Sequence, residues 1–278
     1  MKFEDTYLSD DILDALYDMR FVECTPIQEK CIPEILNYYD IIGVAQTGTG
    51  KTAAYLLPIL SLLSEGDYPN DHINCVIMSP TRELAQQIDN AMQGFSYYLD
   101  NISSVAVYGG NDGNRYDQET KGLRMGASIV IATPGRLLSH IRTGNVDLSK
   151  VSFFVLDEAD RMLDMGFLPD IKRIISKLPK VRQSLFFSAT MSPQIRKLAA
   201  ELVTDPVEIT IAPEAPTVEK INQRVMMVEK NDKDSLLIHL LENHPEWTKV
   251  IVFAKMRHGA DRVNKKLFRA KIPSAAIH

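Results

Sequence analysis

Short apolar runs without interleaved polar residues recur along the first two hundred residues of this 278-residue chain. A run of this kind is typical of a strand whose two faces are both covered, as in a parallel sheet. Stretches with apolar residues at helical spacing lie between the runs, for example residues 82–98 and 193–202. The alternation predicts a doubly wound α/β layer with right-handed crossovers. The predicted strands are residues 40–45, 75–78, 128–132, 153–156 and 185–187.

The pattern changes near residue 205, where Pro206, Pro213 and Pro216 fall close together. Proline disfavours both helix continuation and central strands, so the region reads as a linker. We therefore predict a first domain over residues 1–205, a linker over residues 206–219, and a second domain over residues 220–278.

The second domain begins with the same alternation as the first. Residues 223–228 and 250–253 are predicted strands, and residues 233–243 and 259–270 are predicted helices. About sixty residues is short for a doubly wound domain, so we expect this one to be incomplete.

Composition and charge narrow the function classes. The chain is 45% hydrophobic and 24% charged, as in ordinary globular proteins. Its formal net charge of -5 argues against a passive, strongly basic nucleic-acid binder, so any nucleic-acid contact must come from a local strip of donors. Cys24, Cys31 and Cys75 lack metal-ligand or disulfide spacing and are expected to be buried thiols. Without a signal-like or membrane-spanning apolar stretch, we expect a cytoplasmic protein.

A glycine-rich loop stands between a predicted strand and a predicted helix, which is the context of a phosphate-binding P-loop. Gly48 and Gly50 let the backbone N–H groups turn inward around a diphosphate. Lys51 can reach the β- and γ-phosphates of ATP, and the Thr52 hydroxyl can ligate Mg²⁺. The alternative is a glycine-rich turn with a surface lysine. The loop residues are Ala45, Gln46, Thr47, Gly48, Thr49, Gly50, Lys51 and Thr52, with Ala45 where the strict pattern has Gly.

An acidic run follows the predicted strand at residues 153–156. Asp157 is placed to hold Mg²⁺ directly or through water, and Glu158 to polarise the attacking water as a general base. Alone, these carboxylates could simply begin a helix, where negative charge suits the helix dipole. Beside a P-loop they predict an ATP hydrolase whose catalytic residues are Lys51, Asp157 and Glu158.

Several further motifs stand in the order found in DEAD-box RNA helicases, and the chain resembles that family over essentially its whole length. Residues 157–160 spell Asp-Glu-Ala-Asp. The resemblance implies two RecA-like domains, ATP hydrolysis coupled to RNA binding, and local strand separation of RNA duplexes. The matching segments are residues 25–28 with Phe3 and Phe21 (Q motif), 45–52 (motif I), 80–85 (Ia), 109–110 (double glycine), 133–136 (Ib), 188–190 (III) and 250–255 (IV).

The Q-motif resemblance implies an adenine site. Gln28 would recognise the base edge through its amide, which offers both a donor and an acceptor. Phe3 or Phe21 would stack or pack there, and Thr25 belongs to the same motif. The sequence departs from the family pattern at Arg20, where Gly is usual, and at Cys24, where Pro is usual.

The resemblance also implies a strip for RNA. Arg82 and Arg136 would meet phosphates, and the glycines would let backbone N–H groups approach the strand closely. Contact through the RNA backbone predicts little sequence preference. Ser188 and Thr190 would couple the strip to the nucleotide site. The strip residues are Pro80, Thr81, Arg82, Gly109, Gly110, Thr133, Pro134, Gly135 and Arg136.

The later family motifs, including the arginines that reach the γ-phosphate, have no counterpart before His278. Such an arginine is worth several orders of magnitude in rate. We therefore expect this chain to bind ATP, with hydrolysis and unwinding weak or lost. The alternatives are a nucleotide-gated RNA-binding fragment without turnover and a DNA-directed P-loop ATPase. The RNA target and protein partners stay open.

Overall fold

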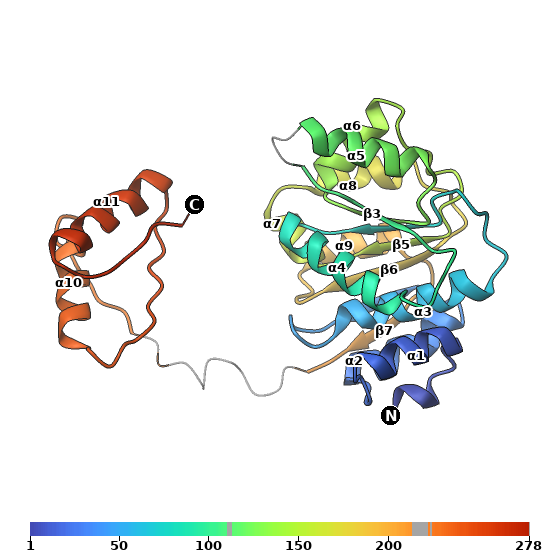
Figure 1. Ribbon diagram of the computed structural model, residues 1–278, viewed down its shortest axis with the longest axis horizontal. Helices are drawn as coiled ribbons and strands as arrows, with labels where there is room; N and C mark the ends of the chain where they lie inside the picture. Colours follow the sequence, from blue (N-terminus) through green and yellow to red (C-terminus); the bar gives the residue numbers. More distant parts are fainter. Residues whose placement is uncertain (110–112, 213–221, 223, 278) are drawn as a thin grey trace. The chain divides into compact units, whose positions relative to one another are not determined.

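The computed structural model describes residues 1–109, 113–212, 222 and 224–277 (Figure 1). The chain divides into two compact units, Met1–Glu214 and Ala215–His278. Within the described residues, none of the helices is both long enough and apolar enough to cross a membrane.

Unit 1 is built on a parallel sheet, and each predicted apolar run forms one of its strands. The described strands pair in the order β3-β4-β2-β5-β6-β1-β7. The predicted doubly wound, RecA-like α/β class is therefore confirmed. The strands are β1 (Ile41–Val44), β2 (Cys75–Met78), β3 (Ser104–Val107), β4 (Ile129–Ala132), β5 (Phe153–Leu156), β6 (Gln183–Ser188) and β7 (Val207–Thr210).

The two strands at the ends of the sheet, β3 and β7, were not predicted from the sequence (Figure 1). An end strand is covered on fewer sides, so its residues need not form a fully apolar run. Strand β7 corrects the linker predicted over residues 206–219, because Val207–Thr210 pair in register with Ile41–Val44. Pro206 directly precedes the strand, a position at which proline costs no ladder hydrogen bond.

Helices cover both faces of the sheet. Neighbouring residues of one strand point to opposite cores: Ile77 packs in one apolar cluster and Val76 in the other. The first cluster takes the apolar sides of α1 (Asp10–Asp18), α2 (Pro26–Leu36), α3 (Lys51–Glu65) and α4 (Arg82–Phe95), with the short turn η1 (Phe3–Asp5). The second takes those of α5 (Gly113–Arg124), α6 (Pro134–Arg142), α7 (Ala159–Asp164), α8 (Leu168–Ile175) and α9 (Pro193–Leu202).

The strand order decides where the candidate residues meet. All parallel strands end at the same edge of the sheet, and ligands of such sheets bind outside these carboxyl ends. The P-loop follows β1, the acidic run follows β5, and residues 188–190 begin at the last residue of β6. The expected RNA segments follow β2, β3 and β4. Because β5-β6-β1 and β3-β4-β2 are contiguous in the sheet, the two groups occupy separate, adjoining halves of one edge.

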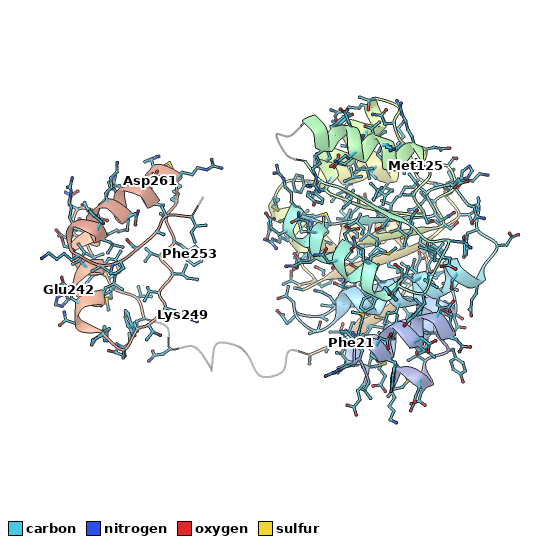
Figure 2. All side chains as sticks on the ribbon, in the orientation of Figure 1. Phe21, Met125, Glu242, Lys249, Phe253 and Asp261 are labelled. Carbon is cyan, nitrogen blue, oxygen red and sulfur yellow. The ribbon has the colours of Figure 1, made fainter. Side chains whose placement is uncertain are left out.

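Unit 2 contains the predicted helices as α10 (Lys233–Asn243) and α11 (Arg257–Arg269), joined by a 2.5 Å ion pair between Lys266 and Asp234. The strands predicted over residues 223–228 and 250–253 are not formed in the described part of this unit, and Gln223 lies outside it. A strand needs a partner for its backbone groups, and apolar sequence alone does not supply one. Phe253 is accordingly 92% exposed (Figure 2).

Candidate nucleotide site and nucleic-acid cleft

The P-loop glycines adopt backbone conformations that other residues rarely reach. Gly48 and Gly50 have φ of 82° and 90°, in the left-handed region. A Cβ on Gly50 would lie 2.5 Å from Nε2 of Gln28. Gly50 is therefore required by the packing of the loop as well as by its turn.

Lys51 is seated inside the loop that it is expected to serve. Its Nζ donates to the backbone oxygen of Ala45 at 2.7 Å, and the side chain is buried. The Thr49 hydroxyl donates to the oxygen of Gln46 at 2.8 Å and stiffens the turn. A phosphate would replace the Ala45 oxygen as the partner of this ammonium. Thr47 and Thr52 complete the predicted loop, Thr52 as the second residue of α3.

Gln28 joins the Q-motif segment to the P-loop. Its Oε1 accepts from the Thr25 N–H at 2.9 Å, and its Nε2 donates to the Gly50 oxygen at 3.1 Å. The side chain is only 3% exposed. Adenine recognition by this amide stays a prediction, which would use its second hydrogen and second lone pair.

The two candidate phenylalanines lie in different surroundings. Phe3 is 2% exposed and belongs to the apolar core, so it packs and has no free face for a base. Phe21, labelled in Figure 2, is 41% exposed. It meets Phe95 edge-on at a centroid distance of 6.1 Å. Of the two, Phe21 is the one available to stack.

The backbone conformation at Arg20 shows why the family usually has glycine at this position. Its φ is 61°, in the left-handed region, where a side chain costs free energy and glycine does not. The chain keeps the turn despite the substitution. Cys24, the other departure from the family pattern, is partly buried.

Asp157 is a buried carboxylate directed at the P-loop side of the sheet. Its Oδ2 accepts from the Tyr55 hydroxyl at 3.1 Å, and its Oδ1 from the Glu158 N–H at 2.8 Å. Burial raises the pKa of Asp157 to about 6, against the opposing positive charge of Lys51. Burial likewise raises the pKa of Tyr55 well above its ordinary value, so this hydroxyl stays protonated as a donor. Tyr55 was missed from the sequence because it reads as one more apolar position of α3.

Glu158 occupies a strained position. Its φ of 50° is unusual for a residue with a side chain, and such strain gathers at functional sites. Nη1 of Arg161 donates to its carboxylate at 3.1 Å. The Glu158 carboxylate is thus paired with the Arg161 guanidinium.

Ser188 and Thr190, which were expected to couple the RNA strip to the nucleotide site, make their contacts with residues of the nucleotide half, and their coupling to the strip stays a prediction. Oδ2 of Asp160 accepts from the N–H and the hydroxyl of Thr190, each at 3.0 Å. The backbone oxygen of Ser188 accepts from the N–H of Ala45 at 3.1 Å. The last residue of β6 therefore contacts the start of the P-loop, and Thr190 just beyond the strand contacts the acidic run.

The donor set suits Mg²⁺ bound together with a nucleotide. Among the described residues, no group of three or more His, Cys, Asp and Glu could hold a metal by itself. A metal here would rest on Asp157, the Thr52 hydroxyl, phosphate oxygens and water, which is how Mg²⁺ is usually held beside phosphates. A buried carboxylate whose pKa is raised is a group that a nearby cation would stabilise in its charged form.

A cleft of about 590 Å³ lies over the carboxyl ends of β2, β3 and β4. Of the nine residues expected for RNA, Pro134 is buried at the start of α6, and Gly110 lies outside the described residues. The sequence missed Glu83, Ser139, Met165 and Phe167, which also line the cleft. The expected residues that the structure brings together there are Pro80, Thr81, Arg82, Gly109, Thr133, Gly135 and Arg136.

The glycines of the cleft leave room for a ligand. A Cβ on Gly135 would meet no atom within 4 Å, so the fold itself does not require glycine there. A Cβ on Gly109 would lie 3.9 Å from Nη2 of Arg82, which places this guanidinium beside the glycine. The open space at Gly135 is what a closely approaching strand would use.

Glu119 of α5 anchors Arg136 from behind the cleft. Its Oε2 accepts from Nε of Arg136 at 2.6 Å and contacts Nε2 of His140 at 3.0 Å, while its Oε1 accepts from the N–H of Tyr108 at 3.2 Å. The ring of Tyr116 stacks on His140 and lies under the Arg136 guanidinium. Burial opposes ionisation of Glu119, but the His140 and Arg136 contacts outweigh it and lower its pKa. These contacts join separate segments of the chain, so no local sequence pattern indicates them.

Comparisons with known proteins agree with this geometry. The DEAD/DEAH box helicase family model matches residues 25–198. ATP-dependent RNA helicase DeaD of Escherichia coli (strain K12) is 40% identical over 276 residues, 99% of this chain and 43% of that protein. ATP-dependent RNA helicase CshA of Limosilactobacillus reuteri is 39% identical over 282 residues, 100% of this chain and 54% of that protein.

The solved structures include a DEAD box protein from the hyperthermophile Methanococcus jannaschii. It superposes with a TM-score of 0.69 at 35% identity, covering 100% of this chain and 73% of that chain. The chain spans about half the length of the curated relatives it matches.

Proposed function

Because this chain belongs to the DEAD/DEAH box helicase family, we propose that it couples ATP binding and hydrolysis at the P-loop to RNA binding in the cleft, and thereby to local separation of RNA duplexes. The observation that carries this proposal is the layout of the sheet edge. The nucleotide residues follow β1, β5 and β6, the cleft residues follow β2, β3 and β4, and β2 adjoins β5.

In the nucleotide half, Lys51 would exchange the Ala45 oxygen for the β- and γ-phosphates. Glu158 would take a proton from the attacking water. The water oxygen would then bond to the γ-phosphorus as the bond between that phosphorus and the β–γ bridging oxygen breaks. Mg²⁺, when bound with Asp157 and Thr52, supplies positive charge against the charge that develops on the phosphates.

In the cleft, Arg82 and Arg136 would bind phosphates, and Gly109 and Gly135 would admit the sugar-phosphate backbone. A few placed donors suffice for such contacts, so the net charge of -5 does not oppose them. Backbone contact predicts binding with little sequence preference. A DNA-directed ATPase is the competing function, and contact with 2′-hydroxyls would separate the two acids.

For these 278 residues we expect ATP and RNA binding with slow hydrolysis and weak unwinding. The cation at the P-loop of unit 1 is Lys51, held by a backbone oxygen, and an arginine reaching the γ-phosphate would add several orders of magnitude in rate. Equal unwinding by this chain and by a longer one with a complete second domain would contradict the expectation. A nucleotide-gated RNA-binding fragment without turnover is the remaining alternative. A cytoplasmic location stays a prediction from the sequence.

The test is Mg²⁺-dependent ATP hydrolysis measured with and without single-stranded RNA, beside Glu158→Gln. RNA-stimulated turnover that Glu158→Gln loses, with ATP binding retained, supports the proposal. ATP binding without turnover assigns the chain to the non-catalytic alternative. Equal stimulation by DNA of the same sequence would reject RNA as the partner, and failure to bind ATP would reject the nucleotide site.

A further inference from the structure

A second, smaller hollow continues the cleft beyond Gly109. It measures about 340 Å³, and we call it the α5 hollow because α5 forms its far wall. Arg82, Glu83 and Gly109 line both the cleft and the hollow, so the two form one continuous surface. The residues that line the hollow alone are Gln86, Tyr108, Arg115 and Gln118.

Arg115 is held in a fixed orientation at the wall of this hollow. Its guanidinium lies 3.7 Å from the centroid of the Tyr108 ring, as in a cation–π pair. The Tyr108 hydroxyl accepts from Nε2 of Gln86 at 2.7 Å, which fixes the ring in turn. The Arg115 side chain remains 35% exposed. An arginine restrained in this way loses little side-chain entropy when it binds a ligand.

The charge of Arg115 is only partly compensated inside the protein. Its Nε lies 3.6 Å from Oε1 of Glu119, too far for a hydrogen bond. Buried Nε itself has no hydrogen-bond partner among the described residues. The same carboxylate already binds Arg136 at 2.6 Å, so its negative charge is shared.

The lining of the hollow favours an anion. Arg82 forms no ion pair within the described part of the chain. The lining contains two arginines, Arg82 and Arg115, but only one carboxylate, that of Glu83; its two amide side chains are neutral. Positive charge, planar guanidinium groups and amide donors together suit a phosphate oxygen.

We propose that the α5 hollow binds one further backbone phosphate of the RNA strand that occupies the cleft, with Arg115 as its main donor and Arg82 shared between the two positions. The proposal rests on the RNA function proposed above. Continuity through Arg82 and Gly109 favours the same strand over a separate acidic ligand, because a strand leaving the cleft past Gly109 enters the hollow. The hollow thus lengthens the contacted strand without reading its bases.

The test asks whether the effect of removing the Arg115 charge on RNA affinity depends on the length of the RNA. Binding of single-stranded oligoribonucleotides of increasing length is measured by fluorescence anisotropy, with a non-hydrolysable ATP analogue, for the wild type and Arg115→Ala. The matched control is Arg196→Ala, an exposed arginine of α9 paired with Glu208 of β7 at the other end of the sheet. Arg115→Lys keeps the charge but not the planar stack. Thermal melting of each variant checks folding.

We expect Arg115→Ala to bind long RNA about five- to tenfold more weakly while binding the shortest RNA as the wild type does. The slope of log affinity against log salt should fall by about 0.7, the value for one phosphate on a single strand. Arg115→Lys should keep part of the affinity, and Arg196→Ala all of it.

Equal weakening at every length would overturn the proposal, because Arg115 would then act only by supporting Glu119 and Arg136. No weakening at any length would overturn it as well. If Arg115→Ala instead abolishes competition by an acidic peptide and leaves the length series unchanged, the hollow takes a protein segment and the proposal is wrong. Wild-type protein that binds no RNA of any length would reject the proposed function itself, which is a distinct result.

Discussion

On the β5-β6-β1 side of the sheet edge, the candidate residues are already bonded to one another, whereas on the β3-β4-β2 side they border open space. Lys51 and Gln28 donate hydrogen bonds to the backbone oxygens of Ala45 and Gly50. Asp157 accepts one from the Tyr55 hydroxyl. Gly135 faces no atom within 4 Å of a Cβ. The nucleotide half is thus a closed set of contacts that a ligand must replace, and the cleft is a surface to which a ligand adds contacts.

This difference predicts how mutations act. In the nucleotide half a substitution changes the stability of the free protein as well as binding. At the rim of the cleft it should change RNA binding alone, except where a cleft residue is anchored from behind.

Glu119→Ala should have the largest effect, because it tests the anchored part of the cleft. Removing this carboxylate leaves Arg136 and His140 without their buried partner, and breaking a buried ion pair typically costs about 3 kcal/mol or more. We expect lower stability in denaturant unfolding and weaker RNA binding in the same variant. If stability is unchanged, the cleft has no internal anchor at Glu119, and the comparison would extend to all of its residues.

Asp157→Asn should stabilise the nucleotide-free protein at pH 8. Burial raises the pKa of Asp157 from 3.8 to about 6, so the folded protein holds this proton more tightly than the unfolded chain does. The stability of the wild type therefore falls as pH rises from about 4 to about 6. Above that range the variant should be more stable by on the order of 3 kcal/mol.

The measurement for Asp157 is denaturant unfolding of both proteins at pH 4 and pH 8. The gap should largely close at the lower pH, where the Asp157 carboxyl of the folded protein is protonated and therefore neutral, as the Asn amide is. A gap of equal size at both pH values would mean that packing, and not ionisation, distinguishes the two side chains.

Gly135→Ala tests the open part of the cleft. The added methyl group meets no protein atom, and alanine reduces the freedom of the unfolded chain, so the melting temperature should stay equal to that of the wild type or rise slightly. RNA affinity should fall about tenfold, which corresponds to about 1.4 kcal/mol, because the methyl group occupies space that the strand needs. Unchanged affinity in anisotropy titrations would place the RNA elsewhere.

Arg20→Gly should have the smallest effect and leave both halves untouched. Glycine relieves the left-handed strain at φ 61°, and the greater freedom of the unfolded chain offsets part of the gain. We expect stabilisation of about 0.5–1 kcal/mol, with ATP and RNA binding unchanged. A loss of stability would show that the Arg20 side chain makes contacts that outweigh the strain.

The features that could be predicted from the sequence are those that depend on residues close together in the chain. The central strands were recognised because burial on both faces demands continuous apolar runs such as residues 153–156. The P-loop and the acidic run were recognised because their chemistry depends on neighbouring residues. Strands β3 and β7 escaped because end strands carry a weaker apolar signal.

The contacts that the sequence did not indicate join distant positions. Tyr55 and Asp157 are 102 residues apart, and the carboxylate that anchors Arg136 lies 17 residues before it on another helix. Met165 and Phe167 line the cleft from the turn between α7 and α8, although the turn carries no phosphate-binding pattern. In unit 2 the apolar runs predicted two strands, but the described residues there form no paired strand.

Strand β7 has a practical consequence for anyone who shortens this protein. A cut at the proline-marked boundary near residue 205 would remove Val207–Thr210 and leave β1, the strand that ends in the P-loop, as the outermost strand. Its freed N–H and C=O groups would then invite pairing with other chains. A fragment that extends through Ala212 would keep β7. The last strand of the first unit thus shields β1, the strand that leads into the P-loop.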